Sequence, residues 1–173
     1  MKKLSFILRI FKRPRRKRKM GQPKIISIGD IYNLEEIYRA LNAEYFENRI
    51  EVPITWFGQK RSGATRYKVL GFYHLDKKII KIHRVLDNVR FPSFFIEYVV
   101  YHEMLHSLFP PLKGRRKRCV HHRTFKEKER EFREFHLAKQ WEREHLWQVI
   151  ASGRISNTAK IGPMQQRERF FLG

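Results

Sequence analysis

The chain has 173 residues, 42% of them hydrophobic and 14% aromatic, which suffices for one domain with a buried core and excludes a disordered composition. Its single cysteine, Cys119, excludes an internal disulfide framework and a cysteine-rich zinc ribbon, and favours a reducing, cytoplasmic setting. The net charge of +21 predicts attraction to polyanions such as nucleic acid, an acidic membrane surface or an acidic protein.

The N-terminal segment is unusually basic. Residues 1–24 carry 11 Lys or Arg and no Asp or Glu. The apolar run at residues 4–11 is too short to span a bilayer, and Arg9 interrupts it, which argues against a signal peptide. Followed by the basic cluster at 13–19, this run suits a membrane-surface anchor over residues 1–19 or a nucleic-acid-binding arm. The alternative is a solvated, flexible tail.

A helix and a small sheet are expected next. Ser27 or Asp30 is predicted to cap a helix that runs to about Asn48, with its apolar residues on one face. Residues 76–78 resemble a hairpin turn. Three runs rich in β-branched and aromatic residues predict a small antiparallel sheet of about three strands: 54–58, 69–75 and 79–84.

Two helices complete the predicted fold. Pro92 favours the start of an apolar helix, and Pro110-Pro111 ends it. After a basic loop, a second long helix is expected from about residues 122–124 to Ala151, with Thr124 forming a capping box with the glutamate three residues later.

The resulting fold class is α+β, and the chain divides into three parts. Residues 1–24 form a basic arm that we expect to be flexible, residues 25–152 form the folded domain, and residues 153–173 form a C-terminal tail.

Within the first of these two helices, the stretch YHEMLHSLFP holds two histidines four residues apart. Residues at this spacing share a helix face, about 6 Å between Cβ atoms, so His102 and His106 can reach one metal ion. Glu103 is then placed to contact a water on that metal without being a ligand. In such an H-E-x-x-H site, zinc acidifies the water, and the carboxylate takes its proton and passes it to a leaving amine. The alternative is a buried helix whose histidines are satisfied by hydrogen bonds.

A catalytic zinc needs a third protein ligand and one open position. The extended pattern H-E-x-x-H-x-x-G-x-x-H is excluded, because Phe109 and Leu112 stand at its Gly and final His positions. A histidine beyond the loop, His121 or His122, could fold back over the metal. A glutamate on the second long helix is the other kind of candidate: Glu127, Glu129, Glu131 or Glu134.

From about residue 30 to residue 151, the order of motifs resembles the SprT-like (Spartan-type) zinc metallopeptidase family. The family's F-N-x-x-F region corresponds to residues 41–46, its H-E-x-x-H helix to residues 102–106, and its H-G-x-x-[FW] element to residues 121–125. The resemblance implies a zincin-like fold, one zinc ion and peptide hydrolysis. It also implies that the third ligand is His121, the first histidine of the last element.

The chain departs from the family pattern at two points. The family glycine that follows the third ligand is His122 here, so His122 stays an alternative ligand. The C-terminal zinc ribbon of some members is missing because its cysteines are missing. A related alternative is the YgjP-like group of metal-dependent hydrolases, whose histidine motif has similar spacing.

The basic loop at residues 113–118 lies between the second and third expected ligands, so we expect it near the metal. Its side chains could hold nucleic-acid phosphates, as could the N-terminal arm: Arg115, Arg116, Lys117 and Arg118. The family resemblance suggests the same, because Spartan-type proteases degrade proteins crosslinked to DNA. A solvated loop is the alternative.

The combined hypothesis is a zinc metallopeptidase acting on a protein substrate. His102, His106 and His121 hold one zinc ion, and Glu103 is the general base and then the proton donor. The competing class is a non-enzymatic basic protein that binds nucleic acid or a membrane surface and contains a structural zinc. The oligomeric state does not follow from the sequence.

Overall fold

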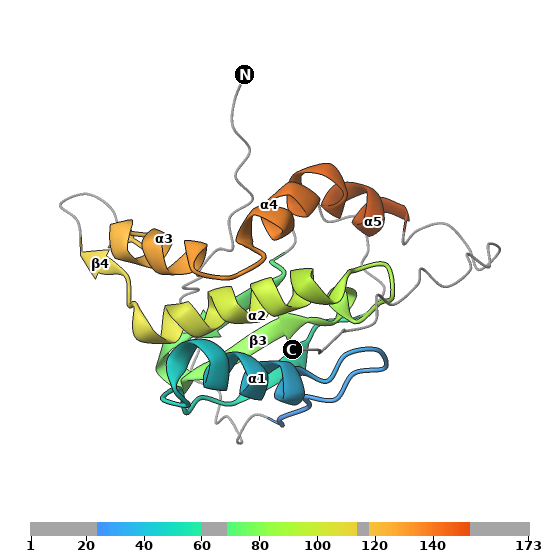
Figure 1. Ribbon diagram of the computed structural model, residues 1–173. Coiled ribbons are helices and arrows are strands. Elements are labelled where there is room, and N and C mark those ends of the chain that lie inside the picture. Colours follow the sequence, from blue (N-terminus) through green and yellow to red (C-terminus); the bar gives the residue numbers. More distant parts are fainter. Residues whose placement is uncertain (1–23, 60–68, 114–117, 153–173) are drawn as a thin grey trace, which may run out of the picture.

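The computed structural model describes residues 24–59, 69–113 and 118–152, and within these ranges it has an α+β fold, as predicted (Figure 1). The helices and strands follow one another in this order: α1 (Leu34–Phe46), β1 (Ile54–Phe57), β2 (Gly71–His74), β3 (Ile79–His83), α2 (Ser93–Leu108), β4 (Leu112–Lys113), β5 (Arg118–Cys119), α3 (Arg123–Arg130), α4 (Phe135–Glu144) and α5 (Leu146–Ser152). Two short 3-10 turns flank β3: η1 (Leu75–Lys77) and η2 (Arg84–Leu86).

The three predicted strands are confirmed, but the sheet they form is mixed rather than antiparallel. Its order is β1-β3-β2, with β3 in the centre. The hairpin through η1, with Lys78 in the left-handed region at φ 46°, makes β2 antiparallel to β3. β1 lies on the other side of β3 and pairs with it in parallel, with Ile54 opposite Ile80.

The core lies between one face of this sheet and the helices α1 and α2. Ile80 and Ile82 of β3 and Trp56 of β1 are buried against these helices. On α2, nearly every residue from Phe95 to His106 is buried, because the helix has the sheet and α1 on one side and α3 and α4 on the other (Figure 1). The predicted bounds of α2 are confirmed, since Pro92 is its N-cap and it ends at Leu108, just before Pro110.

The predicted start of the first helix is wrong by several residues. Asn33, rather than Ser27 or Asp30, caps α1, and its side-chain oxygen accepts a hydrogen bond from the Glu35 N–H at 3.1 Å. The segment before Asn33 is not helical and pairs with β1 instead, since the carbonyl of Ile26 accepts a hydrogen bond from the N–H of Trp56 at 2.8 Å. The end of α1 is also earlier than predicted, since Glu47 has φ 51° and terminates it.

The predicted second long helix is three helices instead of one. The chain turns between α3 and α4, and Phe132 in this turn packs against Tyr45, Tyr98 and Tyr101. The backbone N–H of Arg133 donates to the hydroxyl of Tyr45 at 3.2 Å instead of continuing the helix. The expected capping box at Thr124 is also wrong, because the N-cap of α3 is His122.

Residues 1–23 of the predicted basic arm, the predicted C-terminal tail and loop residues 114–117 lie outside the described residues. β4 and β5, which the sequence did not predict, pair across the two ends of that loop. A search of the described helices for one long and apolar enough to cross a lipid bilayer found none.

Candidate metal centre

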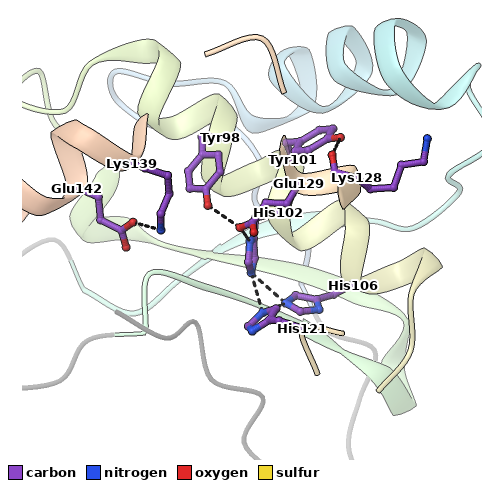
Figure 2. Close-up of polar contacts among 9 residues, drawn as sticks. All are labelled: Tyr98, Tyr101, His102, His106, His121, Lys128, Glu129, Lys139 and Glu142. Carbon is purple, nitrogen blue, oxygen red and sulfur yellow. Dashed lines mark hydrogen bonds and ion pairs between the residues drawn. The ribbon is translucent and has the colours of Figure 1, made fainter. Parts of the chain in front are cut away.

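Three histidine side chains converge at the second half of α2. Nε2 of His106 lies 3.1 Å from Nε2 of His102, and Nε2 of His121 lies 3.2 Å from each of them (Figure 2). Such a cluster is close enough to bind a metal ion. His102 and His106 are one helical turn apart on α2, and His121 comes from the segment between β5 and α3.

The structure separates the roles of the two adjacent candidate ligands. His121 faces the other two histidines, whereas the Nδ1 of His122 accepts a hydrogen bond from the N–H of Phe125 at the start of α3. A side chain that caps a helix is held away from the cluster, so His122 is not one of the converging residues.

Glu129 supports the histidine cluster from α3 without being part of it. Its Oε1 lies 2.8 Å from Nδ1 of His102 and accepts a hydrogen bond from the hydroxyl of Tyr98 at 2.6 Å (Figure 2). Burial would raise the pKa of Glu129, but the hydrogen bonds from His102 and Tyr98 and the nearby Lys139 ammonium lower it to about 2. An ionised carboxylate only accepts, so Nδ1 of His102 carries the proton and Nε2 presents its lone pair to the cluster.

The other glutamates considered as ligands do not reach the histidines. Glu127 pairs with Arg123 at 2.7 Å, Glu131 pairs with Lys128 at 3.0 Å, and Glu134 lies 3.7 Å from Arg133. None of the four glutamates named as possible third ligands is among the converging residues, and Glu129 contributes as the hydrogen-bond acceptor of His102.

The electrostatics of the cluster favour neutral imidazoles. Burial, together with His102 and His121, lowers the pKa of His106 to about 2. Burial and the neighbouring His102 likewise lower the pKa of His121 to about 4. The rings of His106 and His121 are therefore uncharged at neutral pH, and their Nε2 atoms face each other at 3.2 Å. A cation among them would satisfy these lone pairs, so the donor set fits a metal ion.

Phe125 of α3 forms the apolar side of the cluster. Its ring is fully buried and stacks on the ring of His106, with centroids 4.6 Å apart and planes 28° apart. It also contacts His102 and His121, at centroid distances of 5.0 and 4.8 Å. One aromatic ring therefore touches all three histidines and excludes water from that side.

Glu103 directly follows His102 on α2, and its fully buried side chain packs against Gly71 of β2. Neither of its carboxyl oxygens makes a hydrogen bond of good geometry with a described residue. Burial raises the pKa of Glu103 well above its ordinary value, and the backbone of Tyr73 offsets this only in part. The side chain lies directly against Gly71, where a Cβ atom would be 3.0 Å from both its Cγ and its Oε1.

The arrangement therefore combines two chemical capacities. Three imidazoles can hold a cation with an open position, and the buried carboxyl group of Glu103, whose pKa is raised, can take up and release a proton. The contribution of Gly71 was not foreseen, although a glycine in a strand often marks a close approach by another group. Of the four predicted nucleic-acid-binding residues, Arg115, Arg116 and Lys117 lie outside the described ranges, and only the backbone of Arg118 is described, in β5.

Comparisons with protein-family models, with curated proteins and with solved structures found no match to this chain.

Proposed function

We propose that this protein is a zinc-dependent metallopeptidase of the SprT-like type that hydrolyses peptide bonds. The observation that carries the proposal is Glu103. It directly follows His102 on α2, its side chain is fully buried, and neither carboxyl oxygen makes a hydrogen bond of good geometry with a described residue. A structural metal site has no use for such a group, and leaving it unpaired costs stability.

The spacing of the histidine nitrogens supports zinc. Two ligands of a tetrahedral zinc ion with bonds of 2.0–2.1 Å are about 3.3 Å apart. The Nε2 atoms of His102, His106 and His121 are 3.1–3.2 Å apart. Three neutral nitrogen donors are also typical of zinc sites with an open position, whereas magnesium and calcium prefer oxygen ligands.

In this proposal the residues of the chain have three roles: they bind the metal ion, orient one of its ligands and transfer a proton. His102, His106 and His121 hold the zinc ion, and Glu129 keeps His102 in the tautomer that presents Nε2. Bound zinc supplies Lewis acidity, which lowers the pKa of water and polarises a carbonyl group. Glu103 accepts the proton of the attacking water and delivers it to the nitrogen of the leaving amine. The raised pKa of Glu103 suits this role, because it makes the carboxylate a better proton acceptor than an ordinary glutamate.

Replacing Glu103 by Gln tests the proposal. We expect the E103Q variant to bind one zinc per chain like the wild type and to lose cleavage of an unstructured protein such as casein by at least a hundredfold. The exposed Glu127→Gln change on α3 is the control and leaves both properties unchanged. Cleavage by E103Q at the wild-type rate contradicts the mechanism. A wild-type protein that binds zinc and cleaves no peptide bond points to a structural zinc in a basic binding protein, or to a YgjP-like hydrolase with another substrate.

We also propose that the substrates are proteins associated with nucleic acid, and that the basic loop at residues 113–118 binds the nucleic acid. Nucleic-acid binding by this loop is tested by replacing four of its basic residues with neutral ones: Arg115, Arg116, Lys117 and Arg118. We expect weaker DNA binding and a shallower dependence of the binding constant on salt, by about 0.9 in the logarithmic slope for each phosphate that the loop no longer neutralises. An unchanged slope excludes this loop from nucleic-acid binding.

A further inference from the structure

Two buried tyrosines of α2 reach α3 through their hydroxyl groups, and the two hydroxyls have different partners. Tyr98 donates to Oε1 of Glu129 at 2.6 Å, whereas Tyr101 donates to the backbone carbonyl of Lys128 at 2.6 Å (Figure 2). Both residues are almost inaccessible to solvent, with exposed fractions of 3 and 1%. Of these two hydroxyl groups, that of Tyr98 alone binds a residue that also contacts the histidine cluster.

One carboxylate oxygen of Glu129 serves two donors on successive turns of α2. Oε1 lies 2.6 Å from the hydroxyl of Tyr98 and 2.8 Å from Nδ1 of His102, and these two residues are four apart in the helix. A glutamate side chain is long and flexible, so a single hydrogen bond leaves it several rotamers, whereas two donors at a fixed spacing restrict it to one position. The place of Oε1 is therefore set by Tyr98 and His102 together.

The hydroxyl of Tyr98 is itself held in place by aromatic packing. The centroid of its ring lies 6.5, 5.9 and 6.1 Å from the ring centroids of Phe95, Phe132 and Phe135. These three rings come from α2, from the turn between α3 and α4, and from α4. A tyrosine has only two side-chain torsions, and close packing on several sides fixes both. The hydroxyl is thus a fixed point against which the flexible side chain of Glu129 is placed.

A positively charged side chain lies near Tyr98 as well, and it is an alternative partner for Glu129. The ammonium of Lys139 on α4 stands 5.7 Å from the centroid of the Tyr98 ring and pairs with Glu142. In Figure 2 the ring of Tyr98 lies between Lys139 and Glu129. Without the Tyr98 hydroxyl, the carboxylate is free to turn toward this ammonium, since opposite charges attract. Such a turn removes the acceptor from Nδ1 of His102.

We propose that the hydroxyl of Tyr98 is a positioning group of the metal centre, which keeps Oε1 of Glu129 in place so that His102 presents Nε2 to the metal ion. Tyr98 acts through Glu129 and is not itself a ligand. A ligand histidine is oriented by the acceptor of its second N–H, and an acceptor on a mobile side chain orients it poorly. The inference rests on the metal site of the proposed function, but it does not require that the protein hydrolyses peptides.

The zinc affinities of the metal-free full chain and its variants test the proposal. Y98F removes the hydroxyl and keeps the ring. Y101F is the matched control, because it removes a buried hydroxyl that joins the same two helices but has the carbonyl of Lys128 as its partner. E129A removes the acceptor, and the double variant Y98F/E129A shows whether Tyr98 acts through it. Affinity is measured by competition with a zinc-binding dye, and urea unfolding of the metal-free proteins measures their stability.

We expect Y98F to bind zinc about five- to tenfold more weakly than the wild type, and Y101F to bind it with wild-type affinity. Both variants are expected to unfold at similar, slightly lowered urea concentrations, because each loses one buried hydrogen bond. In the E129A background, Y98F is expected to change the zinc affinity by less than about twofold, since the acceptor is gone. Unchanged affinity in Y98F, an equal loss in Y101F, or the same loss in the E129A background overturns the proposal.

Nuclear magnetic resonance of the histidine ring nitrogens supplies a readout that does not depend on zinc. In the metal-free wild type and in Y101F, we expect His102 to show the shifts of a ring that carries its proton on Nδ1, and in Y98F a mixture of the two tautomers. His102 shifts that are the same in Y98F and the wild type overturn the proposal. This readout also separates two failures. A wild type that binds no zinc contradicts the proposed function, while the tautomer of His102 still decides the role of Tyr98.

Discussion

Glu129 on α3 lies 2.8 Å from Nδ1 of His102 on α2, and this contact connects two elements that are 27 residues apart in the chain. It fixes the tautomer and the ring orientation of a histidine whose other nitrogen faces His106 and His121. The site therefore depends on α3 for its geometry as well as on the H-E-x-x-H helix that carries two of its residues.

Replacing Glu129 by Gln is expected to weaken metal binding by 10- to 100-fold, because His102 loses an ionised acceptor for its Nδ1 proton. Isothermal titration of the metal-free protein with zinc measures the change. E127Q is the control on the same helix, since Glu127 pairs with Arg123 at the surface, and it is expected to bind like the wild type. Equal affinities for E129Q and E127Q contradict an orienting role for Glu129.

Gly71 is expected to be required for the position of Glu103. The G71A variant places a methyl group 3.0 Å from the Glu103 side chain and 3.2 Å from Cδ1 of Ile82, so the carboxyl group must move. We expect a stability loss of about 1–3 kcal/mol, the usual cost of overpacking. Under the proposed function, peptide cleavage falls at least tenfold while zinc stoichiometry is kept. Cleavage by G71A at the wild-type rate indicates that the buried position of Glu103 is not the active one.

Phe125 is expected to affect metal binding in a way that other core aromatics do not. It touches all three histidines, whereas Phe132, which is equally buried, contacts Tyr45, Tyr98 and Tyr101. Truncation to leucine should lower the free energy of unfolding by about 1–3 kcal/mol in both cases. Only F125L should also weaken zinc binding. Chemical unfolding and zinc titration of the two variants separate these effects, and matching zinc affinities contradict a role for Phe125 at the site.

The metal-free protein is expected to lose stability as the pH falls from about 6.5 to 4.5. In the unfolded chain His106 and His121 take up protons near pH 6.5, but in the folded state their pKa values are about 2 and about 4. Glu103 acts in the opposite direction, since its raised pKa lets the folded state bind a proton that the unfolded chain binds only near pH 4.5. The two histidines alone correspond to an uptake of about two protons on unfolding, or about 2.7 kcal/mol per pH unit, and the raised pKa of Glu103 makes the loss smaller than this.

Urea unfolding at several pH values measures this dependence, and the E103Q variant provides the control. Without the proton uptake of Glu103, the slope is expected to approach two protons, or about 2.7 kcal/mol per pH unit. A slope for E103Q that is no steeper than that of the wild type contradicts the raised pKa of Glu103.

Local signals predicted the parts of the fold that local chemistry determines. Pro92 and Pro110 bracket α2, the β-branched runs became strands, and the four-residue spacing of His102 and His106 places both on one face. The remaining features depend on partners far away in sequence. Phe132 breaks the predicted long helix because it packs among tyrosines of α1 and α2. Asn33 is the cap of α1 because Asp87 binds the backbone just before it.

In the candidate site, too, some residues follow from a local motif and others depend on how distant segments pack. Glu103 was identified from its motif, and His121 was named as the third residue with His122 as the alternative. The choice between them depends on which histidine caps α3, and this is visible only in three dimensions. Glu129 was one of four candidate glutamates with the same local sequence character, and its contact with His102 follows from the packing of α3 on α2.

The central claim is that His102, His106 and His121 bind one zinc ion, and metal content tests it most directly. The wild type, H121A and H122A are purified without metal, supplied with zinc, dialysed and measured by mass spectrometry. The account predicts one zinc per chain in the wild type and in H122A, and little or none in H121A. No zinc in the wild type after this treatment, or loss of zinc in H122A with retention in H121A, contradicts it.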